Sequence, residues 1–182
     1  GRGENAIEAA QHGQRQDHVL VLAALEGVAD KVRGAKVVRL AREGSSVAVE
    51  EVWEHRLMRN HFNGSVVVDD HLCGFDKAFL KCVSAATGEA SWTLRGLGKG
   101  SLIRADAKLI VLSERGRLVL FAADAAEPRE LASHQVLTGR CWTQPTLADG
   151  RLYLRNAGEM VALDLSAGEA DAAEQEMTGG GE

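Results

Sequence analysis

The chain is poor in aromatic residues, poor in positive charge and free of long apolar runs. Aromatic residues make up 4% of its 182 residues, so surfaces that stack bases or sugars have few side chains to use. Lysine and arginine number 21 against 26 aspartate and glutamate, for a formal net charge of -5. This balance argues against nucleic acid as the main partner, because phosphate binding needs a basic face. No apolar run approaches the ~18 residues of a membrane-spanning helix.

Cysteine is also scarce. The three cysteines are Cys73, Cys82 and Cys141, and none belongs to a C-x-x-C pair. An odd number without such a pair predicts neither a disulfide framework nor a zinc site. We therefore expect all three to be small, buried apolar residues.

What the chain does have is internal repetition. Residues 66–92 consist of three short apolar runs joined by two tight turns, followed by T-G-E-x-x-W. Near copies of the first two-thirds of this stretch begin at Leu102 and at Thr146. Repeats of about 40 residues are typical of four-stranded propeller blades.

The alignment of the copies predicts the strands. Two apolar positions recur in each copy, occupied by Leu72, Leu109 and Leu152 and by Leu80, Leu118 and Met160. Asp149-Gly150 is a strong hairpin signal, because both central residues of such a turn favour positive φ. The predicted strands cover residues 35–40, 47–55, 65–68, 72–75, 79–84, 90–95, 101–104, 109–112, 118–122, 131–136, 146–147, 152–155 and 160–165.

The two ends of the chain do not fit the repeat. We assign residues 1–33 to an N-terminal loop or helical insertion. A helix is possible over residues 4–11, and Asp17 could cap a second one over 17–32. A buried strand over residues 18–23 stays open, because periodicity cannot separate the two in so short a run. Residues 170–182 are acidic and glycine-rich and predict a flexible tail.

The repeats resemble the quinoprotein-type, or PQQ-like, β-propeller family. One match to the family pattern is A-x-T-G-E-x-x-W at residues 85–92, and another runs from Asp149-Gly150 to Gly168-Glu169. The phrases at residues 59–62, 98–103, 113–116 and 139–145 look like a bacterial subgroup similar to the outer-membrane-assembly propeller lipoprotein family. The resemblance covers about residues 34–169. It implies an all-β propeller, in which Gly88 and Trp92 help one blade dock on the next.

The resemblance also sets an expectation about the ring. Family propellers have about seven or eight blades, whereas this sequence accounts for about four. We expect the chain to be part of a longer one. The alternatives are that a partner chain completes the ring, or that the sheets form an open arc with exposed strand edges.

Catalytic chemistry has little support in the sequence. A catalytic quinoprotein would need a carboxylate that holds calcium, an aspartate base and usually a vicinal cysteine pair, and no Cys-Cys occurs. Asp69-Asp70 lies in a predicted hairpin turn, where aspartate is common for backbone reasons. We expect no cofactor and no metal; pyrroloquinoline quinone (PQQ) with calcium is the alternative.

One group of residues is a candidate for ligand or partner binding. Its members fall in connections that precede the first strand of a blade, where they would line one mouth of the propeller channel. They are Arg59, Asn60, His61, Lys99, Arg140 and Trp142. Cations, an amide and an aromatic would suit an anionic or peptide ligand. The alternative is that these polar groups only hydrogen bond neighbouring loops.

Three classes of function therefore remain. The preferred one is a non-catalytic scaffold for protein or peptide partners, and the second is a fragment of a quinone-dependent dehydrogenase. A small-ligand module, for instance for carbohydrate, is disfavoured by the low aromatic content. The resemblance implies a periplasmic or cell-envelope location; no secretion signal is visible in the sequence, so this location rests on the resemblance alone.

Overall fold

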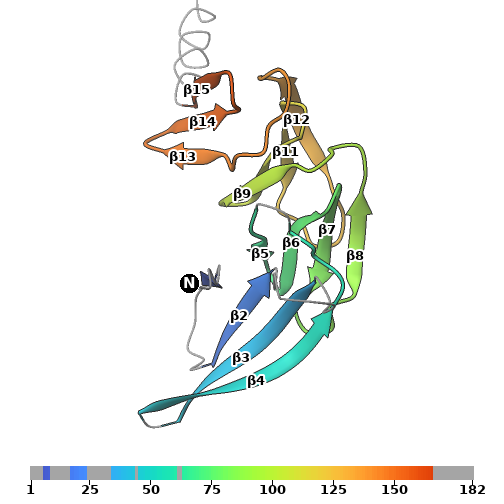
Figure 1. Cartoon of the computed structure of the whole chain (residues 1–182), viewed down its shortest axis with the longest axis vertical. Helices are drawn as coiled ribbons and strands as arrows, with labels where there is room; N and C mark the ends of the chain where they lie inside the picture. The colour runs from blue at the N-terminus through green and yellow to red at the C-terminus, as the bar shows by residue number, and fades with distance from the viewer. Residues whose placement is uncertain (1–5, 9–16, 24–33, 44, 61–62, 166–182) are drawn as a thin grey trace, which may run out of the picture.

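The computed structural model describes residues 6–8, 17–23, 34–43, 45–60 and 63–165. Within them every regular element is a β-strand, and the strands form four antiparallel sheets, which we call blades 1 to 4 (Figure 1). The sheets follow one another along the long axis of the molecule, from blade 1 at one end to blade 4 at the other. The all-β fold predicted from the sequence is confirmed.

The strands of each blade run in chain order. Blade 1 holds β1 (Ala6–Glu8), β2 (Asp17–Ala23), β3 (Ala35–Glu43) and β4 (Ser46–His55). Blade 2 holds β5 (Val66–Val68), β6 (His71–Asp76), β7 (Phe79–Ser84) and β8 (Ala90–Leu94). Blade 3 holds β9 (Ser101–Ala105), β10 (Lys108–Leu112), β11 (Arg117–Ala122) and β12 (Glu130–Gln135). Blade 4 holds β13 (Thr146–Ala148), β14 (Arg151–Arg155) and β15 (Met160–Asp164).

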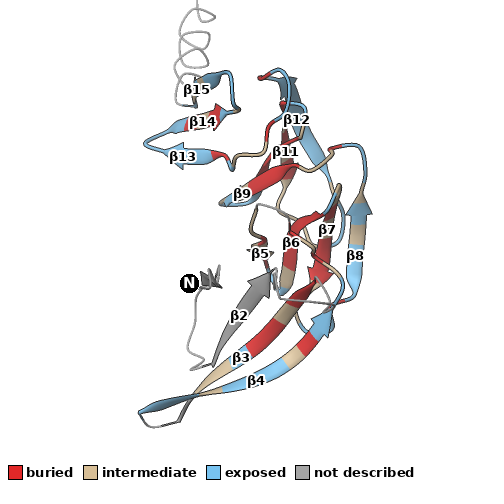
Figure 2. Cartoon of the chain, viewed as in Figure 1, coloured by how far each residue is buried: buried red, intermediate tan, exposed pale blue. Residues whose placement is uncertain are grey.

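The apolar cores lie between the sheets. The second strands are apolar on both faces where a blade has a neighbour on each side, as in β10, whose last four residues are all buried. Figure 2 shows the same extensive burial in β6. The last strands are polar and exposed, as in β12. Blades 2 to 4 each contribute the second residue of their second strand to a core, and these are Leu72, Leu109 and Leu152, at most 2% exposed. The recurring position found in the sequence is therefore a core position.

The N-terminal region differs from the sequence-based expectation. Residues Asp17–Ala23 form β2, which pairs with β3 from Asp17↔Ala41 to Ala23↔Ala35. Of the two alternatives left open for this run, the strand over residues 18–23 is the one that forms, because pairing with β3 satisfies the hydrogen-bonding groups of the backbone. Blade 1 consequently begins before residue 34, where we placed the start of the repeats. The rest of the predicted helices and the acidic tail lie outside the described residues.

The cysteines provide a second correction. Cys73 in β6 lies directly opposite Cys82 in β7, and the two form a disulfide with their Cα atoms 4.0 Å apart. Both are fully buried, as expected, but they are not free thiols. The sequence could not reveal the bond, because only the register of the hairpin places the two residues opposite each other. Cys141 is free and buried.

Candidate functional site

The connections that precede the first strands of blades 2, 3 and 4 are held by a repeated contact. We call these connections, residues 56–65, 95–100 and 136–145, the incoming loops. In each blade a carboxylate at the hairpin between the second and third strands accepts a backbone N–H from the incoming loop. The donor and acceptor pairs are Arg59 and Asp76, Lys99 and Glu114, and Thr138 and Glu159. This contact fixes the end of the propeller at which the predicted site residues lie.

In blade 2 the contact is part of a buried ion pair. Asp76 is fully buried, and its two oxygens accept bonds from Arg59 Nε at 2.6 Å, Arg59 Nη2 at 3.1 Å and Lys81 Nζ at 2.6 Å. Burial alone would raise the pKa of Asp76, but the hydrogen bonds and charges of Arg59 and Lys81 outweigh it and lower the pKa to about 2. The Arg59 guanidinium thus attaches the incoming loop of blade 2 to the end of β6.

Asn60 is engaged in the same loop. Its Nδ2 donates to Ser65 Oγ at 3.0 Å, while its buried Oδ1 has no hydrogen-bond partner in the described part of the chain. The third predicted residue of this loop, His61, lies outside the described residues. Arg59 and Asn60 therefore serve local contacts, which is the alternative that the sequence leaves open for the whole group.

Three other predicted residues do come together, at the loops of blades 3 and 4. Arg140 Cζ lies 4.6 Å from the ring centroid of Trp142, and Lys99 Nζ lies 5.9 Å from it. Trp142 Nε1 donates to Glu114 Oε1 at 3.2 Å, and the other oxygen of Glu114 accepts the Lys99 backbone N–H at 3.2 Å. Two cations therefore lie over one half-buried indole, whose N–H is bound to a carboxylate.

Glu114 is the member of this cluster that sequence reasoning missed. The hydrogen bond from the Lys99 backbone lowers the pKa of Glu114, helped by the Trp142 indole and the two cations and opposed by burial. Glu114 therefore stays ionised and places one negative charge beside the two cations, Lys99 and Arg140. Alignment of the hairpin turns could have found it, because Glu114 follows the β10 strand much as Asp76 ends β6.

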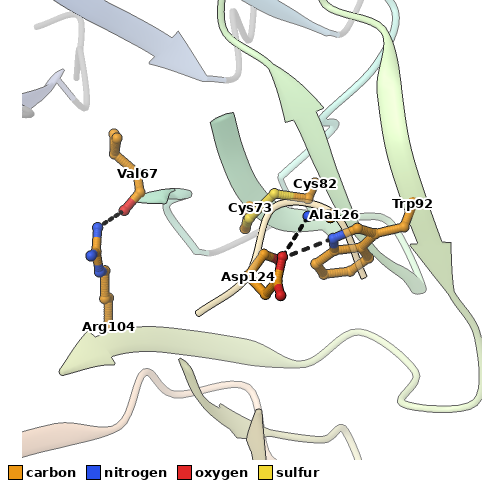
Figure 3. The surroundings of a disulfide bond; sticks show 7 residues. All are labelled: Val67, Cys73, Cys82, Trp92, Arg104, Asp124 and Ala126. Atoms are coloured by element: carbon orange, nitrogen blue, oxygen red, sulfur yellow. Dashed lines mark hydrogen bonds between the residues drawn. A yellow bond between two sulfur atoms is a disulfide. The ribbon is translucent and has the colours of Figure 1, made fainter. Parts of the chain in front are cut away.

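At the outer edge of the blades, tryptophans join neighbouring sheets. The last strand of a blade carries one extra residue, a β-bulge, just before the tryptophan position. Trp53 Nε1 of blade 1 donates to Ala85 O at 2.8 Å in blade 2. Trp92 Nε1 of blade 2 donates to Asp124 O at 3.3 Å in blade 3, near the disulfide (Figure 3). In blade 3 the same position is occupied by Ala132.

Gly88 lies beneath the first of these tryptophans. Its φ is +74°, and a Cβ there would approach His55 Cδ2 to 2.5 Å and Trp53 Cδ2 to 3.2 Å. Only glycine combines this backbone conformation with such close approach. Gly88 and Trp92, which the resemblance implies in blade docking, both lie at contacts between blades.

The described residues offer neither a metal centre nor a membrane-spanning helix. They contain no group of three or more His, Cys, Asp or Glu residues that could hold a metal ion. No helix within the described ranges is long and apolar enough to cross a membrane.

Comparison with known proteins supports the fold. A scan against protein-family profiles and a search of curated proteins found no match. Among solved structures the chain is similar to BamB from Moraxella catarrhalis, with a TM-score of 0.54 and 14% identity over 84% of this chain and 44% of that one. It is also similar to the computationally designed Ika8 protein, with a TM-score of 0.48 and 14% identity over 85% and 57%. The likeness to BamB shows a β-propeller fold, and this chain spans less than half of BamB's length.

Proposed function

We propose that this chain is a non-catalytic part of a PQQ-like propeller that binds a protein or peptide partner in the bacterial cell envelope. One observation carries the proposal: the side chains of Lys99 and Arg140 both lie over the ring of Trp142, in loops at one end of the blades. The likeness of the fold to BamB agrees with a scaffold role. The remaining blades would come from a longer chain or from a partner chain.

The cluster has the chemistry of a recognition site. Tryptophan and arginine are enriched among the interface residues that carry most of the binding energy, because each combines a large contact area with a polar group. Arg140 is exposed, so its guanidinium can form paired hydrogen bonds with a carboxylate of the partner. The edge of the Trp142 ring supplies an apolar contact beside it. A peptide that offers an acidic and an apolar group would therefore satisfy both.

The disulfide supports the envelope location. Bonds such as Cys73–Cys82 form and persist in oxidising compartments, including the bacterial periplasm, and are rare in the cytosol. The sequence resemblance to the outer-membrane-assembly propeller lipoprotein family points to the same compartment.

Selection of random peptides displayed on phage against the immobilised chain tests the proposal. We expect enriched peptides that lose about tenfold or more in affinity on Trp142→Ala, as removal of an interface anchor does. Lys108→Ala, an exposed substitution at the opposite end of blade 3, is the matched control and should leave binding unchanged. Failure to enrich any peptide, or peptides indifferent to Trp142→Ala, would contradict the proposal.

The competing hypothesis is a fragment of a quinoprotein dehydrogenase. It is tested by titrating the chain with PQQ and calcium while following the melting temperature. Saturable binding that raises the melting temperature, together with dye reduction by an alcohol, would overturn the scaffold proposal.

A further inference from the structure

The two ends of blades 2 to 4 carry opposite charge. We call the incoming loops and the hairpin turns between second and third strands the basic end. The described residues of its connections hold seven cations and two carboxylates, with Asp76 beside them at the end of β6. They are Arg56, Arg59, Lys77, Arg95, Lys99, Arg115 and Arg140 against Glu114 and Glu159. The turns at the other end, which we call the acidic end, hold seven carboxylates and one cation: Asp69, Asp70, Glu89, Asp106, Asp124, Glu127 and Asp149 against Arg129.

The fold explains part of this pattern but not all of it. Asp69, Asp106 and Asp149 adopt φ values of 51°, 49° and 48°, a conformation that aspartate tolerates well in tight turns. These acids therefore have a structural reason to be there. The exposed cations of the basic end have no corresponding role in the backbone, apart from Lys77 with a φ of 58°. Arg95 also lies over the Phe79 ring and Arg140 over Trp142, but these contacts do not require the exposed cations of the other connections to share their sign.

The charge of the basic end is also available to a partner. Its two carboxylates and the neighbouring Asp76 already accept hydrogen bonds from their own incoming loops. Five of the seven cations are exposed: Arg56, Lys77, Arg95, Arg115 and Arg140.

The acidic end does not cancel this field. The strands between the two ends have five or six residues in the second and third positions of each blade. At ~3.3 Å per residue the ends are about 17–20 Å apart, more than twice the ~8 Å Debye length at physiological salt. A molecule that approaches the basic end therefore meets positive charge, although the whole chain carries -5.

We propose that the basic end is the docking face of the propeller and that the segment it receives is an acidic stretch of a protein partner. This inference rests on the proposed function, since it names the chemistry of the partner. An acidic protein segment is short enough to meet the basic end alone, whereas an anionic membrane or a nucleic acid extends past it and also meets the net charge of -5 on the whole chain. Among the exposed large apolar side chains of the described residues, only Met160 adjoins this end, which leaves little to insert into a bilayer.

The test compares three fluorescein-labelled peptides of equal length, rich in glutamate, in lysine or in uncharged serine and glycine. Their binding to the whole chain is followed by fluorescence anisotropy at low and at physiological salt. We expect the glutamate peptide to bind best and to weaken as salt rises. Arg115→Glu with Arg140→Glu should weaken it by about tenfold or more, since like charges brought together cost at least the ~1.4 kcal/mol that this factor represents.

The matched control makes the same change of net charge at the other end. Lys108→Glu with Arg129→Glu alters two exposed cations near the acidic end. It should change the affinity by less than about twofold, because both positions lie more than one Debye length from the docking face. Equal weakening by both double variants would mean a net-charge effect and overturn the inference.

The remaining outcomes separate the inference from the proposed function. If the uncharged or lysine peptide binds best, the acidic partner is wrong while peptide binding stands. If no peptide binds but vesicles with anionic lipid do, both are wrong and the basic end is a membrane-binding face. Circular dichroism of each variant confirms that loss of binding is not loss of folding.

Discussion

The contacts between neighbouring blades are of two kinds. Blades 1 and 2, and blades 2 and 3, are joined at their outer edge by a tryptophan that follows a β-bulge, Trp53 or Trp92. Between blades 3 and 4 the bulge is present, but Ala132 follows it. The tryptophan of that third contact is Trp142, which lies at the basic end and is flanked by two cations.

The difference separates two uses of one residue type. The indole N–H groups of Trp53 and Trp92 donate to carbonyl groups of the next blade and their rings pack in or against the cores, so they contribute to stability. Trp142 donates to the carboxylate of Glu114 and has two cations over its ring, an arrangement that suits the binding of a partner. The first two contacts should therefore be stronger than the third, and four changes test that order.

Trp92→Ala should have the largest effect, because it removes the indole that closes the contact between blades 2 and 3. We expect a loss of about 4 kcal/mol in the free energy of unfolding, as for other large aromatics truncated in a core. Urea denaturation measures it. Trp142→Ala is the control and should cost about 1 kcal/mol, a typical single-substitution effect. Equal losses in the two variants would remove the distinction between the contacts.

Asp76→Asn should come next. It leaves Arg59 and Lys81 without their shared counter-charge, and we expect a loss of about 3 kcal/mol, as when a buried ion pair loses one partner. Glu114→Gln, the equivalent change at the third contact, should cost less than about 1 kcal/mol because Glu114 is only half-buried.

The ion pairs of Asp76 with Arg59 and Lys81 also predict that stability depends on pH. The pKa of Asp76 in the folded chain, about 2, lies below its ordinary value of 3.8. The ionised carboxylate therefore adds about 2 kcal/mol of stability that is fully present above about pH 4 and is lost as the pH falls through 2. Urea denaturation at several pH values should show this loss in the wild-type chain and not in Asp76→Asn. A parallel decline in both would assign acid sensitivity to other groups.

Removal of the disulfide should have an intermediate effect. Cys73→Ala with Cys82→Ala should cost about 2 kcal/mol, because the unfolded chain gains freedom and the core between blades 2 and 3 loses volume. Cys141→Ala, in the core between blades 3 and 4, should cost about 1 kcal/mol or less as a small buried truncation. The melting temperatures of the variants rank them, and a larger effect at Cys141 would contradict the ordering.

Ala132→Trp should have the smallest effect, in the opposite direction. It restores at the third contact the residue found at the first two, and we expect a gain of about 1 kcal/mol from added aromatic contact. Ala132→Leu controls for apolar area without the indole N–H. A loss of stability in Ala132→Trp would show that the third contact has no room for the docking used by the others.

Local repetition in the sequence predicted much of this fold. The alignment of Leu72, Leu109 and Leu152 located the second strands, and Asp149-Gly150 forms a turn with positive φ at both residues, as its composition indicates. These features depend on neighbours in the chain, so the residues themselves carry the information.

The other features of the fold and site depend on how strands and loops pair with one another. The disulfide follows from the register of β6 against β7, and the pairing of β2 follows from β3, twelve or more residues later. The candidate cluster was only half visible. Lys99, Arg140 and Trp142 could be named from the loops that contain them. The role of Glu114 and the ion pair of Arg59 with Asp76 could not, because they depend on which hairpin packs against each loop.

The placement of the cores between sheets has a consequence for how such a chain can change in length. Each of blades 2 and 3 supplies half of two cores, and none of the four sheets closes a core alone. The natural unit of insertion or deletion is therefore a whole repeat, such as the 39-residue spacing between Trp53 and Trp92. Loss of a complete repeat brings two compatible half-cores together, while loss of one strand leaves both neighbours uncovered. Unfolding of one blade should accordingly destabilise its neighbours, and this coupling should be weakest at the contact between blades 3 and 4.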